Sequence, residues 1–303
     1  MFGNPTGFDW ILVFSMSYIN ALNMILVAES GSTKTDWRWI RADRSEFGWQ
    51  TVGINPFYQS QDSVAEVLER DVFPQITEAP EAVYYYGTGL TGEPQKQTLE
   101  QLFHRKWPST RKIVLESDVL GAARALFGDG AGLAAILGTG SNSARYAEGK
   151  LVFQVPPLGF WLGDEGSGGH LGKQLVLAYL HREMSAGVRT QFEAQFGAFD
   201  RTPILEAAYQ KPFPNRYFAQ YTPFIRAHIT DPFLENLVID SFTLFFEKYL
   251  MKYPQTSPLG FVGSVAHYFR PQLEQVAQTV GLDIQNVLAA PLDALVRYHV
   301  NHQ

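Results

Sequence analysis

Two stretches of the chain share one pattern: a short apolar run, a polar turn that contains glycine, and a segment in which apolar and polar residues alternate. The first stretch covers residues 24–40 with its turn at 29–33, and the second covers residues 133–147 with its turn at 138–141. A continuous apolar run predicts a buried strand, and strict alternation predicts a half-buried one. Each stretch therefore predicts a β-hairpin, and an ordinary hairpin turn is the simplest interpretation of either one alone.

The rest of the chain alternates between apolar strand segments and helical patterns. Strands are expected at residues 48–52, 83–87, 112–115 and 259–263, and an irregular segment at 152–159. Helices are expected at residues 60–76, 93–107, 119–127, 169–183, 188–196, 202–209, 219–228, 234–252 and 272–281, after Ser264 and from residue 291. An initial meander followed by this alternation predicts α/β architecture with a mixed sheet.

Both turns have the composition of an anion-binding loop. The first contains Gly31, Ser32 and Thr33, and the second contains Gly138, Thr139, Gly140 and Ser141. Glycine lets the backbone approach a ligand closely, and successive N–H groups in such a turn can converge on a phosphate. Because one turn lies in each half of the chain, the pair predicts a nucleotide held in a cleft between two similar halves.

Composition narrows the function further. The 303 residues suffice for two domains, and the net charge of −6 argues against non-specific nucleic-acid binding. The chain has no cysteine, which excludes disulfides and Cys-ligated iron–sulfur clusters and is compatible with a reducing cytoplasm.

Residues 1–23 contain no Lys or Arg, and their apolar run at 10–14 is too short to span a bilayer. We expect them to be a dispensable extension, with a membrane-associating tail as the lesser alternative.

Four carboxylates lie where chemistry is expected. Asp118 follows a buried strand and precedes a helix rich in small residues, so a general base and a helix N-cap are equally good interpretations. Asp164 and Glu165 are adjacent on a glycine-flanked turn, so Asp164 is expected to face a Mg²⁺–phosphate cluster and Glu165 the substrate or solvent. First-turn helix acidity is the plainer alternative. Glu29 precedes the first turn and could hold Mg²⁺ through water.

The remaining candidates carry weaker signals. Lys34 could reach a phosphate or face solvent, and the loop around it is not a Walker A motif because a strand follows it. His170 and His181 lack metal-ligand spacing and are expected to be surface or core residues.

The order of the motifs resembles the BadF/BadG/BcrA/BcrD ATPase family, and within it the N-acetylglucosamine kinase-like branch. The resemblance rests on residues 29–37, 53–56, 117–118, 137–143, 163–167 and 261–264, and it extends from residue 24 to the C-terminus. It implies an actin-like ATPase fold, in which RNase H-like domains at 24–130 and 131–303 close over ATP and a sugar. The last helix would pack back on the first domain, and many members are homodimers.

The resemblance also implies roles for single residues. Residues 31–33 and 138–140 would be the two phosphate loops, and Asp118 the base that acts on the sugar 6-hydroxyl. Gly263 and Ser264 would lie near the adenosine. The sugar would contact the side chains of Asn55, Ser141, Asn142 and Asp164. Pro56 and Phe57 stand where the family carries a sugar-binding tryptophan.

These observations predict a cytoplasmic kinase that uses ATP and Mg²⁺ to phosphorylate an amino sugar. N-acetylglucosamine is the first candidate for this sugar. The expected ligands of the metal are Glu29 and Asp164, and those of the substrate include Glu165. A kinase for glucosamine or N-acetylmuramic acid, and a non-catalytic ATP- and sugar-dependent switch or sensor, are the alternatives. The reductive activators of the same superfamily are excluded, because they need cysteine.

Overall fold

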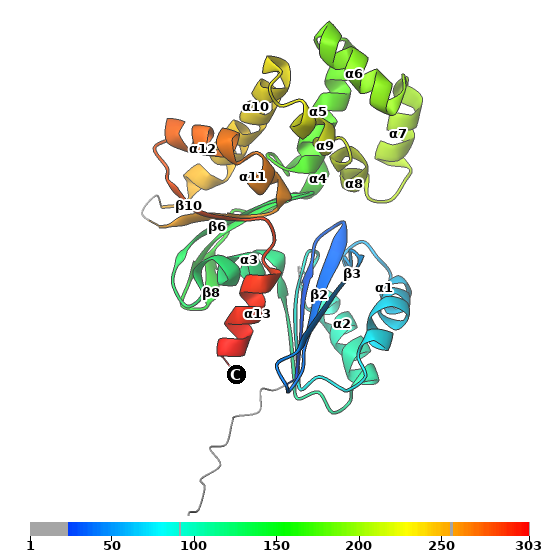
Figure 1. Ribbon diagram of the computed structural model, residues 1–303, viewed down its shortest axis with the longest axis vertical. Helices are drawn as coiled ribbons and strands as arrows, with labels where there is room; N and C mark the ends of the chain where they lie inside the picture. Colours follow the sequence, from blue (N-terminus) through cyan, green and yellow to red (C-terminus); the bar gives the residue numbers. More distant parts are fainter. Residues whose placement is uncertain (1–23, 91, 255–256, 303) are drawn as a thin grey trace, which may run out of the picture.

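Two five-stranded mixed sheets, one in each half of the chain, organise the computed structural model (Figure 1), which describes residues 24–90, 92–254 and 257–302. The extension expected at residues 1–23 lies outside the described residues. The first sheet has the order β3-β2-β1-β4-β5 and the second the order β10-β9-β6-β7-β8. The strands are β1 (Ile25–Ser30), β2 (Lys34–Ile40), β3 (Glu46–Val52), β4 (Ala82–Gly87), β5 (Lys112–Ser117), β6 (Gly132–Leu137), β7 (Ser141–Ala147), β8 (Lys150–Phe153), β9 (Leu259–Val262) and β10 (Ile284–Leu288).

The two sheets have the same topology. In the first, β1 is antiparallel to β2 and parallel to β4; in the second, β6 is antiparallel to β7 and parallel to β9. The two predicted hairpins, β1–β2 and β6–β7, therefore occupy equivalent places. The predicted α/β architecture of two domains with mixed sheets is confirmed.

Helices pack against both sheets, and most of them lie on the side of the second sheet that faces away from the first sheet (Figure 1). They are α1 (Gln61–Val67), α2 (Glu93–Lys106), α3 (Asp118–Phe127), α4 (Gly159–Leu162), α5 (Gly168–His181), α6 (Ala186–Phe196), α7 (Arg201–Tyr209), α8 (Pro214–Ala219), α9 (Thr222–Ala227), α10 (Pro232–Lys248), α11 (Ser264–Tyr268), α12 (Arg270–Thr279) and α13 (Leu292–Asn301). None of these helices, which cover the described residues only, is long and apolar enough to cross a membrane.

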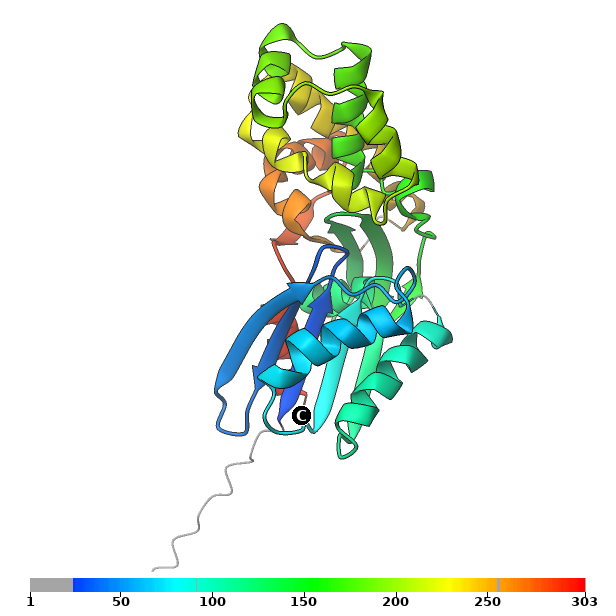
Figure 2. The ribbon, with the colours of Figure 1, turned by 90° about the vertical axis from the view of Figure 1, so that its right-hand side faces the viewer.

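Alternation along β1 places its side chains in two different cores. Leu26 and Ala28 pack in the core formed with α1 and α2, whereas Ile25 and Val27 pack with Leu295 of α13. In Figure 2, α1 and α2 cover the near face of the first sheet, and α13 lies behind it. The C-terminal helix therefore returns from the second sheet to the first.

Alternation along β6 has the same effect. Leu133, Ala135 and Leu137 join the large core under α5 and α10, and Ala134 faces α3. Helix α3 contacts strands of both sheets, including β4 and β6. The small residues Gly121, Ala122 and Ala123 of α3 allow the helix to pack closely against both sheets, because their side chains add little volume.

Several sequence-based boundaries were wrong. Strand β10 was not predicted, because its central residues Gln285 and Asn286 are exposed and break the apolar pattern. The segment expected to be irregular at 152–159 begins inside β8 and ends in α4. The helix expected at 60–76 continues beyond α1 as a π-helical turn (Leu68–Val72) and a 3₁₀ turn (Phe73–Gln75).

The helix expected at 219–228 is α9, which begins three residues later than expected. Helix α8 was missed, and it is separated from α9 by Gln220 and Tyr221. Phe213, directly before α8, has a left-handed φ of 57°, which sequence periodicity does not reveal. The helix expected at 234–252 ends as α10 at Lys248 and is followed by a 3₁₀ turn, Leu250–Lys252.

Helix α8 is held by a close crossing with α5. A Cβ atom on Gly172 of α5 would overlap the backbone carbonyl of Phe218 in α8. Backbone cannot rotate away from such an overlap as a side chain can, so the crossing requires glycine at this position.

We expect Gly172→Ala to destabilise the protein by about 2 kcal/mol or more, because it overpacks this contact. Thermal denaturation should show a melting temperature lower by about 4 °C or more. Gly187→Ala in α6 is the matched control: nothing lies within 4 Å of its added Cβ, and alanine favours helix by up to about 1 kcal/mol. Equal melting temperatures for the two variants would contradict this explanation of the crossing.

Candidate functional site

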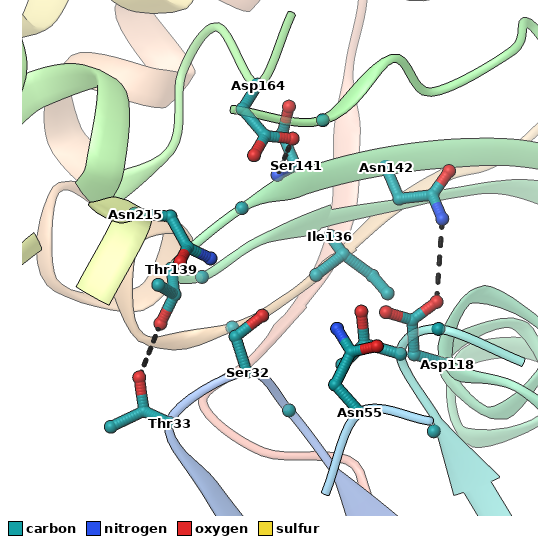
Figure 3. A pocket seen from close by; sticks show the side chains of 18 of the residues that line it. Ser32, Thr33, Asn55, Asp118, Ile136, Thr139, Ser141, Asn142, Asp164 and Asn215 are labelled. Carbon is teal, nitrogen blue, oxygen red and sulfur yellow. Dashed lines mark hydrogen bonds between the residues drawn. The ribbon is translucent and has the colours of Figure 1, made fainter. Parts of the chain in front are cut away.

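A deep cleft of about 1980 Å³ separates the two sheets and is lined by residues of both domains (Figure 3). Almost every residue singled out in the sequence lines it. From the first domain these are Glu29, Gly31, Ser32, Thr33, Lys34, Asn55 and Asp118; from the second they are Gly138, Thr139, Gly140, Ser141, Asn142, Asp164, Gly263 and Ser264. Glu165 is the exception.

The two hairpin turns face each other across the cleft. Each is closed by a backbone hydrogen bond, from Gly31 N to Lys34 O and from Gly138 N to Gly140 O, both 3.0 Å long. The hydroxyl groups of Thr33 and Thr139 are 2.9 Å apart and join the two turns directly. The turns that the sequence predicted as a pair are therefore neighbours in space.

Each turn is supported from behind by a glycine that the sequence analysis gave no such role. A Cβ on Gly53 would lie 2.5 Å from Gly31 O and 2.6 Å from Ser32 O. A Cβ on Gly263 would overlap Leu137 O, and its left-handed φ of 123° also favours glycine. These contacts fix the position of each loop by direct backbone packing.

The second loop is also anchored to α5. The N–H groups of Gly168 and Gly169 at the start of this helix donate to Gly138 O at 2.8 Å and Thr139 O at 3.0 Å. The loop carbonyls thereby satisfy donors that a helix terminus leaves unpaired. On its other side, a Cβ on Gly138 would meet nothing within 4 Å, so this loop borders open space.

Asp118 lies where the two domains meet. Its Oδ1 accepts hydrogen bonds from Val119 N at 2.7 Å and from Asn142 Nδ2 of the second domain at 3.4 Å (Figure 3). The Oδ1 of Asn142 accepts in turn from Gln154 Nε2 at 2.9 Å. The N-cap of α3 is Ser117, so capping does not explain Asp118.

Burial raises the pKa of Asp118, and the hydrogen bonds from Val119 and Asn142 oppose this effect. A carboxylate with a raised pKa is a better proton acceptor than an exposed one. Asp118 is therefore suited to act as a base toward a hydroxyl group in the cleft.

Asn55 is buried at the wall of the cleft near Asp118. Its Oδ1 accepts from Phe57 N at 3.1 Å, and a Cβ on Gly89 would overlap this oxygen. The preceding residue, Ile54, is tied to the side chain of Ser30 by hydrogen bonds of 3.0 and 3.1 Å. Asn55 is thus held by the strand that carries the first loop.

Asp164 is fixed against the second loop. It has a left-handed φ of 60°, and its Oδ1 accepts from Ser141 N at 3.1 Å. Such strained backbone persists where the surrounding structure enforces it, often at ligand sites. Burial, with additions from the charges of Glu165 and Asp118, raises the pKa of Asp164 to about 6.

Glu29 is a third carboxyl group of the cleft whose pKa is raised. Burial, and then the charges of Asp36 and Asp118, raise its pKa to about 8. No group of three His, Cys, Asp or Glu side chains with metal-binding geometry occurs in the described part of the chain. Mg²⁺ commonly uses one or two carboxylates and completes its shell with water and phosphate oxygens, so Glu29 and Asp164 are compatible with it.

The expectation that Glu165 faces the substrate is wrong. Among the described residues it does not line the cleft; its carboxylate pairs with Lys248 of α10 and accepts from Tyr249 Oη at 3.1 Å. The hydrogen bonds from Lys248 and Tyr249 lower its pKa although burial raises it. Lys34 lines the cleft, but it forms an ion pair of 2.9 Å with Asp36. His170 is buried and bonded to Ser241, as expected of a core histidine.

Comparison with known proteins gives a close structural match. The structure of a "Putative N-acetylglucosamine Kinase" from Porphyromonas gingivalis is 40% identical to this chain, with a TM-score of 0.87 over 92% of this chain and 99% of that one. A protein from Chromobacterium violaceum that carries the same description is 17% identical, with a TM-score of 0.70 over 92% and 99%. MreB 5 of Spiroplasma citri, solved bound to AMPPNP, is 9% identical, with a TM-score of 0.57 over 93% and 96%.

The two more distant structures show the shared fold and confirm the expected actin-like ATPase architecture. Neither the protein-family models nor the curated proteins gave a match to the chain.

The position of Glu165 leads to a test. We expect Glu165→Gln to lower stability by about 1 kcal/mol, because it removes the charge that faces the half-exposed Lys248. Affinity for nucleotide and sugar should stay within about twofold of wild type, since the carboxylate does not line the cleft. Isothermal titration and thermal denaturation measure the two effects. If the variant were as stable as wild type but bound nucleotide or sugar tenfold more weakly, Glu165 would have to be part of the binding site.

Proposed function

Since the chain belongs to the family of the "Putative N-acetylglucosamine Kinase" of Porphyromonas gingivalis, we propose that it is an ATP-dependent carbohydrate kinase that phosphorylates an amino sugar. N-acetylglucosamine is the proposed substrate and its 6-hydroxyl the proposed acceptor. We also propose that the chain belongs to the BadF/BadG/BcrA/BcrD ATPase family, that it is cytoplasmic and that it can form a homodimer.

The position of Asp118 carries this proposal. Its carboxylate lies in the cleft next to the side chains of Asn55 and Asn142, on the side away from the contact between Thr33 and Thr139 (Figure 3). Phosphoryl transfer depends mainly on positioning and charge neutralisation, and a carboxylate that accepts the hydroxyl proton assists it. A cleft with two loops on one side and one partly buried carboxylate on the other suits this reaction.

The proposed roles follow the geometry. Residues 31–33 and 138–140 would hold the phosphates of ATP, and Gly263 and Ser264 would lie beside the adenosine. Asn55, Ser141, Asn142 and Asp164 would orient the sugar, and Asp118 would take the proton from its hydroxyl. ATP supplies the phosphoryl group and Mg²⁺ neutralises its charge; Glu29 and Asp164 would hold the metal through water.

The proposed activity is tested by measuring ADP release from Mg²⁺–ATP in a coupled assay with single sugars. We expect N-acetylglucosamine to stimulate release more strongly than glucosamine, N-acetylmuramic acid or glucose. Stronger stimulation by another sugar would support the kinase activity but identify a different substrate. The specificity would then be examined at Phe57, near Asn55. ATP binding without stimulation by any sugar would contradict the kinase and favour a switch or sensor.

The role of Asp118 is tested by Asp118→Asn, which keeps the shape of the side chain and removes the base. We expect turnover to fall by about 10²–10⁴-fold with ATP affinity within a few-fold of wild type. Asp283→Asn, at an exposed position outside the cleft, is the control and should keep full turnover. Near-normal turnover of Asp118→Asn would rule out the assigned base.

A further inference from the structure

The cations that line the cleft differ in whether their charge is already compensated. Lys34 is paired with Asp36 at 2.9 Å, and Lys96 with Glu116 at 3.0 Å. The guanidinium group of Arg226 lies 3.6 Å from the centre of the Tyr268 ring. Arg216 also lines the cleft, and neither Arg216 nor Arg226 takes part in an ion pair within the described residues; Arg216 is the one that donates to Gly53, next to the first loop. A cation in this situation is available to an anionic ligand.

Arg216 extends from α8 toward the first domain. Its guanidinium group lies over the Phe213 ring at 3.7 Å, which fixes its plane, and Nη2 donates weakly to Gly53 O at 3.5 Å. Its Nε is buried and has no hydrogen-bond partner among the residues that the structure describes. A buried donor without a partner is costly, and a bound acceptor would remove that cost.

Gly53 places this guanidinium group beside the first loop. The N–H of Gly53 donates to Thr33 O at 3.0 Å, and its Cα packs directly on Gly31 and Ser32. Arg216 therefore reaches the segment that supports the first loop, although it belongs to the other domain.

Helix α8 also lies next to the second loop. A Cβ on Gly168, whose N–H bonds to Gly138 O, would lie 3.5 Å from the Ala219 side chain of α8. Asn215, the residue before Arg216, lines the same cleft as Thr139 (Figure 3). Helix α8 thus lies next to the anchor of the second loop through Ala219 and reaches the support of the first loop through Arg216.

We propose that Arg216 binds the phosphate groups of ATP, as the cation that α8 brings to both loops. This role rests on the proposed function, because the triphosphate is the ligand that the loops would hold. The guanidinium group suits it, since its planar array of donors can bond two phosphate oxygens at once. Lys34, which the sequence offered for this role, is engaged by Asp36.

The test compares Mg²⁺–ATP with adenosine, which lacks phosphate, by isothermal titration of the full-length protein. We expect Arg216→Ala to weaken binding of ATP by about 10–100-fold, as lost charge-assisted hydrogen bonds do, and of adenosine by less than about twofold. Arg216→Lys should recover part of the ATP affinity. Arg201→Ala, at an exposed position of α7, is the matched control and should bind both ligands as wild type does.

Thermal denaturation without ligand checks that the variants are folded. If Arg216→Ala unfolds, Arg216→Gln takes its place, because it keeps a donor near Gly53 and removes the charge. Equal losses for ATP and adenosine, or unchanged ATP affinity, would overturn the role of Arg216 alone. A wild-type protein that binds no ATP would overturn the proposed function together with it.

Discussion

Two close backbone contacts determine the geometry of the cleft. Gly53 packs against the carbonyl groups of Gly31 and Ser32, and Gly263 packs against the carbonyl group of Leu137. In each domain the loop between two antiparallel strands is thereby held by the residue that follows a strand of the same sheet. A side chain at either glycine would push the loop into the cleft, so the site depends on the absence of two Cβ atoms.

The site also depends on the contact between the two domains. Asp118 starts α3, which contacts both sheets, and its carboxylate is bonded to Asn142 of β7. The paired hydroxyls of Thr33 and Thr139 also join the domains. The candidate base and the candidate phosphate loops therefore acquire their arrangement only when both domains are in place. A site with this construction can respond to domain movement, which both a kinase and a switch require.

The sequence predicted what depends on local pattern and missed what depends on distant partners. The two hairpins were predicted because their apolar runs, turns and alternation are continuous in the chain. Strand β10 was missed because Gln285 and Asn286 interrupt its pattern, although the equivalence of the two halves requires a fifth strand there. Glu165 was misplaced because its direction is set by Lys248, 83 residues further along. Arg216 gave no signal at all, since its position depends on the crossing of α8 with α5 at Gly172.

The central claim is that the cleft transfers a phosphoryl group from ATP to a sugar hydroxyl. The most direct measurement is phosphorus–proton correlation NMR of the products formed by wild-type protein from Mg²⁺–ATP and N-acetylglucosamine. We expect a sugar phosphate whose phosphorus couples to the protons on carbon 6, formed in equal amount with ADP. Inorganic phosphate as the only phosphorus product besides ADP would contradict it, because the protein would then hydrolyse ATP without using the sugar as acceptor.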